Sequence, residues 1–299
     1  ASIIFTRIAN LSHIRDFDCV FFQRDIIVHV YPFIENLIKH RQKNIIFDFD
    51  DLISFYPASN RTGFFFRFIW DKRKIEKIIK LSKHIIVGNN LLKKYVQNFT
   101  ENVTVIPTSV DLRAYNFKKE NGLKTEKICI GWIGSQATFG YLQRIYPVFQ
   151  ELAKNYNIEL KVIGTKGRQV KGLRINYKDW SLDTEIKDIH SFDIGIMPLT
   201  DDEWSRGKSG TKLLQYMAIG IPAVASPVGV NTEIIKDGMN GFLADTKEVW
   251  VEKISLLIEN QRLRAELVNN ARKDVERFYS IQVNAPKLLE VLKKVVLST

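Results

Sequence analysis

The sequence predicts an α/β protein with two doubly wound domains, each a parallel sheet covered by helices on both faces. Apolar runs of strand length alternate with amphipathic helical patterns along the 299 residues. The strand-like runs are continuously apolar, which is typical of parallel strands buried on both sides. A polar stretch at 117–127, FKKENGLKTEK, divides the strands into two sets and indicates an interdomain linker.

The first set belongs to a domain that we expect to span 1–123, together with a C-terminal helix at 283–299. Its expected strands lie at 19–23, 44–49, 84–89 and 103–108, and its expected helices at 31–41, 67–82 and 90–98. The second set belongs to a domain at 124–282. Its expected strands lie at 127–134, 158–164, 173–178, 193–199 and 221–226. Its helices are expected at 139–155, 183–191, 211–219, 231–236, 247–258 and 260–277, and the C-terminal helix of the first domain is expected at 284–296.

Composition favours a cytoplasmic protein. No run reaches the roughly 18 apolar residues that a spanning helix needs, and the chain starts on a strand-like SIIF without the pattern of a signal peptide. Cys19 and Cys129 stand in unrelated contexts, so we expect no disulfide framework. The five histidines are scattered without ligand spacing, and we expect no metal site and no cofactor.

The net charge of +11 is uneven. Residues 1–125 hold 20 Lys and Arg against 12 Asp and Glu, whereas the remainder carries only +3. The basic half indicates an anionic partner, such as a membrane or a lipid phosphate, although simple solubility explains it too. Within it, the stretch 63–84 joins a cluster of aromatic side chains to a basic helix, as in interfacial membrane anchors. The alternative is a helix that packs on the sheet through Ile75, Ile78 and Ile79.

The segment 206–233, RGKSGTKLLQYMAIGIPAVASPVGVNTE, carries the strongest functional signal. A basic glycine-containing loop opens a helix there, and such a helix start binds phosphate through backbone N–H groups and the helix dipole. Lys208 and Lys212 add full charges, with Arg206 just upstream. The ligand that this pattern predicts is a diphosphate, as part of a nucleotide. The plainer interpretation is an ordinary helix start with Thr211 near its cap.

Several pieces of the sequence follow one another as in a known family: VTVIPTSVD (103–111), IGWIGS (130–135), ELKVIG (159–164), FDIGIMPL (192–199), GTKLLQYMAIGIPAVASPVGVNTEII (210–235) and DGMNGFLA (237–244). In this order they resemble the nucleotide-sugar domain of group 1 (family 4) glycosyltransferases, which have the GT-B fold of two Rossmann-like domains. IIFDFDDLI (45–53) resembles one subgroup of the same family. The resemblance covers roughly residues 19–280 and implies a metal-independent enzyme that retains the anomeric configuration.

The chain departs from the family in three respects. The family's first strand and glycine-rich loop have no counterpart before Asp18, so we expect the N-terminal domain to be shortened. The family's two glutamates, seven residues apart, fall on Gly207 and Gln215. The family's Arg and Lys after the first strand of the donor domain fall on Ser135 and Phe139, neither of which is basic.

The resemblance implies a set of donor-binding residues. Their backbone or side chains would contact the diphosphate, the ribose or the base, and they are Gly134, Ser135, Gln136, Gly164, Thr165, Trp180, Ser209, Gly210, Thr211, Lys212, Leu213 and Gln215. Gln215 stands where the family's Glu holds the ribose hydroxyls, and an amide oxygen still accepts a hydrogen bond. Trp180 is placed to meet the base, or else is a packed edge aromatic. Gln215 is otherwise a helix-surface residue.

Four residues are candidates for the chemistry. Arg206 and Lys208 replace the family's missing Arg and Lys and would stabilise the departing diphosphate, unless they lie in a solvated loop. Asp50 aligns with the family's active-site His, and Asp51 follows it at the carboxyl end of a strand. Two carboxylates there would orient the acceptor hydroxyl or take its proton. Asp51 is equally a candidate cap for the next helix.

The sequence therefore predicts a glycosyltransferase that moves a sugar from a nucleotide-diphosphate sugar to a glycan or lipid-linked acceptor in cell-surface polysaccharide synthesis. The 124–282 domain would bind the donor and the N-terminal domain the acceptor, on the inner face of a membrane. Two alternatives stay open: a non-catalytic nucleotide-binding scaffold, which Gln215 and the short first domain suggest, and a sugar-nucleotide epimerase. Nucleic acid is not an expected partner, since no groove-reading motif accompanies the basic helix.

Overall fold

The computed structural model describes residues 10–24, 32–51, 71, 73–117 and 127–297. These fall into two compact units. Residues within 1–108, 207–209 and 284–299 form the first unit, and residues within 109–206 and 210–283 form the second. Each unit holds one parallel sheet with helices, so the predicted α/β class with two parallel sheets is confirmed.

The division between the units differs from the expected boundary at 123/124. The segment after Thr108 joins the second unit because Val110 pairs there: its N–H donates to the Tyr279 carbonyl (2.8 Å), and its carbonyl accepts from Ile281 (3.2 Å). Further on, the Phe117 ring lies against Gly220. Most of the expected linker, residues 118–126, lies outside the described residues.

The first unit is a four-stranded parallel sheet in the order β1-β2-β3-β4. The strands are β1 (Val20–Gln23), β2 (Ile45–Phe49), β3 (His84–Val87) and β4 (Val103–Val105). Its helical elements are η1 (Asn10–Asp16), α2 (Phe33–Arg41), α4 (Lys74–Leu81), α5 (Asn90–Gln97) and, from Asn284 onward, α14 (Ile281–Leu297).

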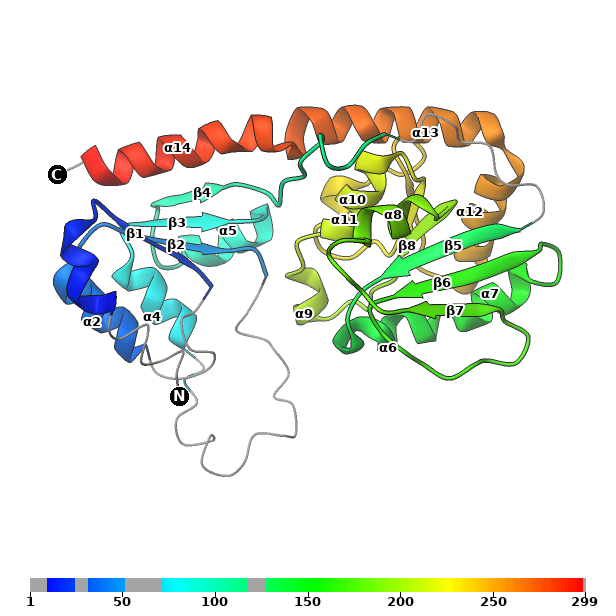
Figure 1. The fold of residues 1–299 in the computed structure, drawn as a ribbon, viewed down its shortest axis with the longest axis horizontal. Coiled ribbons are helices and arrows are strands. Elements are labelled where there is room, and N and C mark those ends of the chain that lie inside the picture. The colour runs from blue at the N-terminus through cyan, green and yellow to red at the C-terminus, as the bar shows by residue number, and fades with distance from the viewer. Residues whose placement is uncertain (1–9, 25–31, 52–70, 72, 118–126, 298–299) are drawn as a thin grey trace, which may run out of the picture. The chain divides into compact units, whose positions relative to one another are not determined.

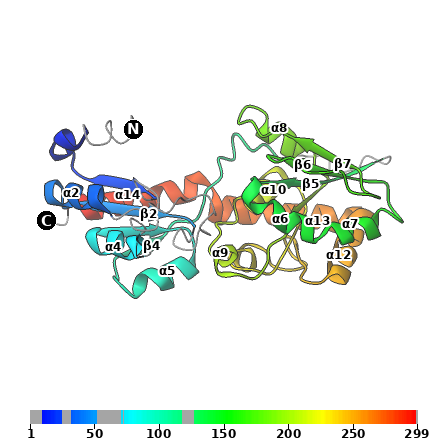
Figure 2. The same ribbon diagram turned by 90° about the horizontal axis from the view of Figure 1, so that it is seen from below.

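Helices lie against each face of this first sheet (Figures 1 and 2). Phe47 packs with side chains of α2, α4 and α5 on one face, and Ile46 packs with Val291 and Val295 of α14 on the other. Neighbouring residues of a strand point to opposite faces, so the apolar side chains of Ile46 and Phe47 in β2 allow this two-sided burial.

Helix α4 settles part of the question raised by residues 63–84. Ile75, Ile78 and Ile79 are buried against the sheet, as the packing alternative predicted. The basic side of the helix is not wholly in solvent, however, because Lys74 is buried with Glu35 and its Nζ lies 3.3 Å from the carboxylate. Burying a charge is tolerated when such a partner is at hand. The aromatic cluster at 64–70 lies outside the described residues.

The second unit is a six-stranded parallel sheet in the order β10-β9-β8-β5-β6-β7. The strands are β5 (Ile128–Ile133), β6 (Ile158–Ile163), β7 (Ile175–Lys178), β8 (Ile194–Met197), β9 (Ala223–Ala225) and β10 (Phe242–Leu243). The chain order reverses at β5, which lies between β6 and β8. In doubly wound sheets, ligands bind at such a switch point, outside the carboxyl ends of the strands.

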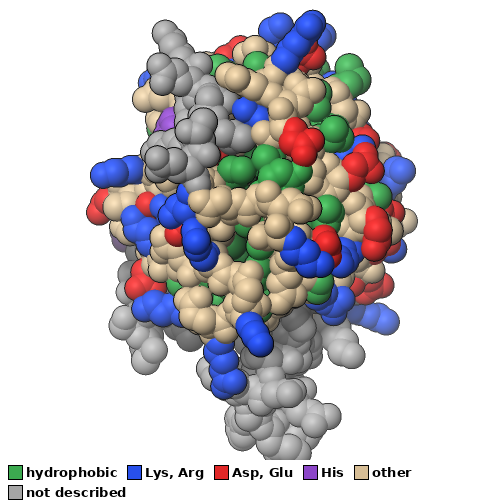
Figure 3. All heavy atoms as spheres, turned by 90° about the vertical axis from the view of Figure 1, so that its right-hand side faces the viewer, with side chains coloured by type: hydrophobic (Ala, Val, Ile, Leu, Met, Phe, Trp, Pro, Cys, Tyr) green, Lys and Arg blue, Asp and Glu red, His purple; other side chains and the backbone are tan. Residues whose placement is uncertain are grey.

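Helices flank this sheet and bury its two faces (Figures 1 and 2). They are α6 (Gln136–Arg144), α7 (Tyr146–Leu152), α8 (Glu185–His190), α9 (Glu203–Arg206), α10 (Thr211–Ile219), α11 (Asn231–Ile234), α12 (Lys247–Glu259) and α13 (Gln261–Asp274), which continues into the π-helical turn η3 (Val275–Tyr279). On the face of this unit seen in Figure 3, basic and acidic side chains are interspersed with hydrophobic ones, as on an ordinary solvated surface.

Some expected elements are divided or were missed. The expected helix at 139–155 is two helices that meet at Ile145, because Pro147 stands in the first turn of α7 and has no N–H to continue α6. The two-residue β10 and the four-residue α9 are too short to leave a periodic pattern in the sequence.

Among the helices that the structure describes, none is long and apolar enough to cross a bilayer.

Candidate functional site

Two glycines mark the carboxyl edge of the second sheet. Gly134 follows β5 and Gly164 follows β6, and a Cβ atom at Gly164 would lie 2.5 Å from the Gly134 carbonyl oxygen and 3.4 Å from the Trp180 Cβ. Gly164 also has φ +90, a conformation that L side chains rarely adopt. The sequence placed these three residues at strand ends, and the structure brings them into contact.

Lys212 reaches the same edge from helix α10. Its Nζ lies 4.7 Å from the centroid of the buried Trp132 ring, and 2.9 Å from where a Cβ at Gly134 would stand. The face of an indole attracts a cation, and this contact fixes an otherwise flexible side chain. The structure therefore sets the ammonium of Lys212 beside the turn after β5, which no sequence spacing showed.

The start of α10 requires glycine at position 210. Gly210 has φ +72, and a Cβ there would lie 2.4 Å from the Ile234 side chain. The first intrahelical bonds come from Leu213 and Leu214, whose N–H groups both donate to the Gly210 carbonyl. The N–H groups of Thr211 and Lys212 precede these bonds and carry the positive end of the helix dipole.

Leu213 has a structural role and not the donor-binding role that was expected. Its side chain is fully buried in the core of the second unit, and its N–H is bonded to the Gly210 carbonyl at 2.9 Å. Neither group is therefore offered to a ligand. Leu213 instead anchors the first turn of α10, which positions the neighbouring Lys212.

The turn after β5 offers further polar groups. Ser135 and Gln136 are exposed where α6 begins, and the backbone carbonyl of Ser135 accepts a hydrogen bond from Thr138. Thr165, after β6, is buried and donates its hydroxyl to the Gln136 amide oxygen. The structure thus joins the expected residues of the β5 and β6 turns through one hydrogen bond.

Gln215 lies one turn into α10 in a cluster that the sequence did not reveal. Its Nε2 lies 2.9 Å from the Tyr115 hydroxyl and 2.8 Å from Oε1 of Glu185, the first residue of α8. The Trp180 indole N–H donates to the other carboxylate oxygen at 2.5 Å. Tyr115 and Glu185 were not expected site residues, and only the polar character of the α8 start hinted at Glu185.

Burial, together with the hydrogen bond to Glu185, raises the pKa of Tyr115 to about 12, so its hydroxyl stays protonated and donates. Trp180 is half exposed, with 50% of its surface accessible. It is thus not the fully packed edge aromatic of the plainer interpretation. Its ring stands at the end of β7 with its N–H fixed by Glu185.

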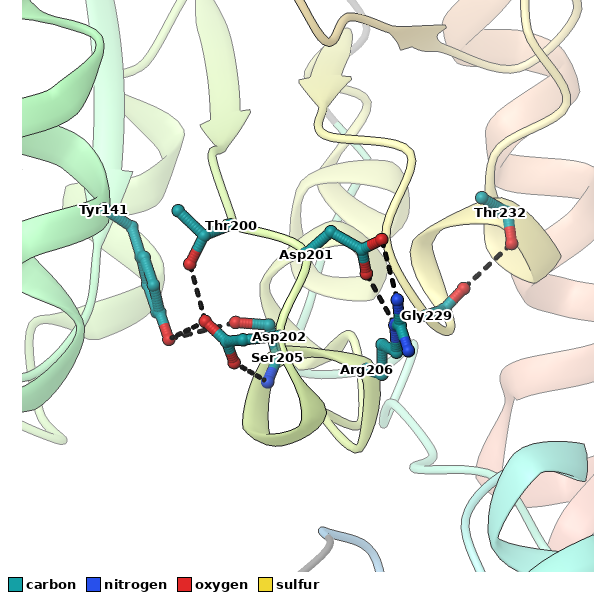
Figure 4. A network of polar contacts seen from close by, with 8 residues as sticks. All are labelled: Tyr141, Thr200, Asp201, Asp202, Ser205, Arg206, Gly229 and Thr232. Carbon is teal, nitrogen blue, oxygen red and sulfur yellow. Dashed lines mark hydrogen bonds and ion pairs between the residues drawn. The ribbon is translucent and has the colours of Figure 1, made fainter. Parts of the chain in front are cut away.

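Arg206 is held by a neighbouring carboxylate (Figure 4). Its Nε and Nη2 donate to the two oxygens of Asp201 at 2.6 and 2.9 Å, and both side chains are about half exposed. Helix α9 is fixed beside it, because Asp202 accepts from the Ser205 N–H (2.8 Å). The turn at Gly229 also approaches closely, since a Cβ there would lie 2.5 Å from the Arg206 carbonyl.

Residues 207–209 group with the first unit rather than the second. Lys208 and Ser209 are partly buried there, and the Ser209 N–H donates to the Asp51 carboxylate at 3.2 Å. The sequence had counted Ser209 with the donor-binding residues and Lys208 with the catalytic ones.

Three carboxylates gather around Arg24 in the first unit. Arg24 follows β1 with φ +61, unusual for a residue other than glycine. Its guanidinium lies 3.0 Å from Asp50 and 3.3 Å from Asp51. Burial and the nearby Asp50 raise the pKa of Asp48 to about 6, and the same two causes raise the pKa of Asp51. The helix that Asp51 was alternatively expected to cap lies outside the described residues.

Comparison with known proteins gives one family. Residues 115–274 match the family described as glycosyl transferases group 1. An uncharacterised glycosyltransferase of Methanocaldococcus jannaschii is 27% identical over 196 residues, which are 60% of this chain and 48% of that protein. This chain therefore spans about half the length of that relative.

Solved structures show the same fold. The sucrose-phosphate synthase of Thermosynechococcus elongatus has a TM-score of 0.72 at 12% identity, over 99% of this chain and 78% of that chain. The Anabaena protein HepE, solved with UDP and glucose, has a TM-score of 0.70 at 13% identity, over 96% and 81%. The predicted GT-B fold of two Rossmann-like domains is confirmed.

The raised pKa of Asp48 predicts a pH-dependent stability. A carboxyl group with a folded pKa of about 6 and an ordinary value of 3.8 favours its protonated form in the fold. Its contribution is complete below about pH 4 and is lost as the pH rises to about 6. Relative to Asp48→Asn, the wild type should lose on the order of 2 kcal/mol of unfolding free energy between pH 4 and 6.

Urea denaturation at a series of pH values measures this difference. Asp18→Asn, at an exposed carboxylate of the same unit, serves as the control. Stability curves of the wild type and Asp48→Asn that run parallel from pH 4 to 7 would contradict the interpretation.

Proposed function

Because family-specific similarity covers 115–274, the chain belongs to the group 1 glycosyl transferases, and we propose that it transfers a sugar from a nucleotide-diphosphate sugar to an acceptor hydroxyl. One observation carries the proposal: the ammonium of Lys212, a residue of the first turn of α10, lies beside Gly134 at the carboxyl edge of the second sheet. A cation, a helix start and a glycine turn at one place form a site for a diphosphate.

In this proposal the second unit binds the donor. The N–H groups of Thr211 and Lys212 bind the diphosphate, and the Lys212 ammonium offsets the negative charge that develops as it departs. Arg206 assists, since its pair with Asp201 is half exposed and such pairs contribute little stability. Anabaena HepE was solved with UDP and glucose, and we extend to this chain the class of those ligands, a nucleoside diphosphate and its sugar.

Departure of the diphosphate is proposed to need no metal ion, because Arg206 and Lys212 of the second unit supply positive charge that offsets the charge of the leaving group. Retention of the anomeric configuration is part of the same proposal and follows from family membership. Transfer that persists in EDTA would support metal independence, and loss of activity in EDTA would contradict it. A product of unchanged anomeric configuration by NMR would support retention, and an inverted product would contradict it.

We propose a glycan or lipid-linked acceptor in cell-surface polysaccharide synthesis, on the inner face of a membrane. The net +8 of residues 1–125 supports this, because an anionic membrane or lipid phosphate attracts such a surface. In this proposal Asp50 and Asp51, which both pair with Arg24, orient the acceptor hydroxyl or take its proton. Binding to vesicles with and without anionic lipid tests the membrane part.

A non-catalytic nucleotide-binding subunit is the second candidate. The observation that favours it is Gln215, whose amide nitrogen is bonded to Tyr115 and Glu185. Such a subunit would bind a nucleoside diphosphate without turnover, whereas an epimerase would convert the nucleotide sugar without any acceptor. One turnover assay with and without acceptors separates the three.

Lys212→Ala should weaken the binding of a nucleoside diphosphate by about tenfold or more, because a charge-assisted contact to phosphate contributes about 1.5–3 kcal/mol. Calorimetric titration of UDP, GDP and ADP into the wild type and the variant measures the effect. Lys154→Ala is the matched control, since Lys154 is exposed and pairs with Glu151 on another surface of the same unit. Equal affinities of wild type and Lys212→Ala would refute the diphosphate assignment.

Asp50→Asn should lower kcat by about 100-fold or more while leaving the affinity for the nucleoside diphosphate unchanged, because it removes a group that accepts a proton from the acceptor hydroxyl. The measurement is release of nucleoside diphosphate from nucleotide sugars offered with a panel of glycan and lipid-linked acceptors. Asp18→Asn, which removes an exposed carboxylate of the same unit, is the control. A kcat within about threefold of the wild type would remove Asp50 from the mechanism.

A further inference from the structure

The amide of Gln215 has a direction that its neighbours determine. The atom that faces Tyr115 and Glu185 lies 2.9 Å from the hydroxyl and 2.8 Å from the carboxylate oxygen. The Tyr115 hydroxyl has one proton, and it donates that proton to Glu185 at 2.8 Å. Both neighbours therefore accept, and the amide atom that meets them must be the nitrogen. The carbonyl oxygen then points the other way.

The carbonyl oxygen of Gln215 is left to a ligand. Among the residues that the structure describes, no group donates to Oε1. The residue is 91% buried, yet this oxygen is not sealed from solvent. An acceptor oxygen that is held in one direction and open to solvent binds a donor group, such as a hydroxyl.

Glu185 is itself fixed in place. Its helix, α8, is anchored by the buried Asp188, whose carboxylate lies 2.6 Å from the Lys178 ammonium and 3.5 Å from that of Lys161. Both lysines stand on the sheet, at β7 and β6. Helix α8, from which Glu185 projects, is therefore tied to the sheet, because moving the helix would break the ion pairs of the buried Asp188.

Helix geometry says which part of a ligand meets Gln215. Thr211 and Gln215 are four residues apart in α10, so they lie on one face about 6 Å from each other along the axis. In a nucleoside diphosphate, the ribose follows the phosphates directly. With the diphosphate at the Thr211 N–H, the ribose hydroxyls come over Gln215, and Trp180 lies beyond, next to Glu185.

We propose that Glu185 is a positioning residue that turns the Gln215 amide so that its carbonyl oxygen accepts a hydrogen bond from a ribose hydroxyl of the donor. This inference rests on the proposed function, since it specifies the ligand of the same site. It also accounts for the pairing of the two side chains. A carboxylate at 215 would meet that of Glu185, whereas an amide at 215 and a carboxylate at 185 fit together with one negative charge.

The test compares a ribonucleotide with its 2′-deoxy form, because only a group that reads the hydroxyl changes their ratio. UDP and 2′-deoxy-UDP, or the corresponding pair for the base that the wild type prefers, are titrated by calorimetry. The wild type should bind the ribonucleotide about tenfold more tightly, as expected for one hydrogen bond of about 1.4 kcal/mol. Glu185→Gln should reduce this preference to about twofold, since an amide at 185 no longer dictates the direction of Gln215.

Exchanging the two residues should restore the preference. In Glu185→Gln/Gln215→Glu, the amide at 185 donates to the carboxylate at 215, which then offers its other oxygen to the hydroxyl. Lys212→Ala is the matched control, because it should weaken both nucleotides alike and leave their ratio unchanged. Should Glu185→Gln fail to fold by circular dichroism, Gln215→Met, which removes the carbonyl while keeping the shape, should also abolish the preference.

The outcomes separate this inference from the proposed function. If no nucleoside diphosphate binds to the folded wild type, the donor site itself is refuted. If the wild type binds one but shows no preference for ribose, or if Glu185→Gln or Gln215→Met keeps the tenfold preference, the donor site stands and the role of Glu185 is wrong.

Discussion

The packing of helix α10 on strand β8 is the constraint on which the candidate donor site depends. Every residue from Leu213 to Ile219 is buried, so the helix has no solvent face along which to slide or turn. Its Tyr216 ring fills the place where a side chain at Gly195 of β8 would stand, since a Cβ there would lie 2.5 Å from the ring. Tyr216 meets the Phe192 ring edge to face at 6.0 Å, and Phe192 in turn lies on Gly131 of β5.

Two strand glycines thus fix two aromatic rings, and the rings fix the helix. Because α10 is held along its length, its N-terminus and Lys212 are held as well. Larger side chains at Gly131 or Gly195 would displace the rings, which is the kind of overpacking that cores tolerate poorly. The precision of the proposed phosphate site is therefore a property of the core beneath it.

The sequence was sufficient for the elements but not for all of the contacts. Strand β5 and helix α10 follow from apolar runs and from glycines at their ends. Gly134, Gly164, Trp180 and Lys212 were expected near one another because the family resemblance places all four at the donor. The contact of Lys212 with Trp132 was not predictable, since the two residues are far apart in the sequence and Trp132 stands in an apolar strand typical of a core. Glu185 was missed for a related reason: its partners, Tyr115 and Gln215, are 70 and 30 residues away, and no local pattern joins them.

Leu213 shows the opposite error, because a residue beside phosphate-binding positions was assigned to the ligand although its apolar side chain belongs to the core.

In both units, the charged side chains of the candidate sites are positioned by the charged or polar side chains beside them. The negative charge beside the proposed ribose position stands on Glu185 of α8 instead of on α10, so Gln215 need not weaken the site as its sequence suggests. Arg206 is paired with Asp201, whereas the ammonium of Lys212 lies beside Gly134 in the turn after β5. In the first unit, Arg24 pairs with both Asp50 and Asp51. Burial raises the pKa of the nearby Asp48.

A crystal structure of the chain with a bound nucleoside diphosphate tests the central claim most directly. The account predicts that the diphosphate lies at the N–H groups of Thr211 and Lys212, with the Lys212 ammonium in contact with a phosphate oxygen and still over the Trp132 ring. A diphosphate bound elsewhere, with the start of α10 empty, would contradict it.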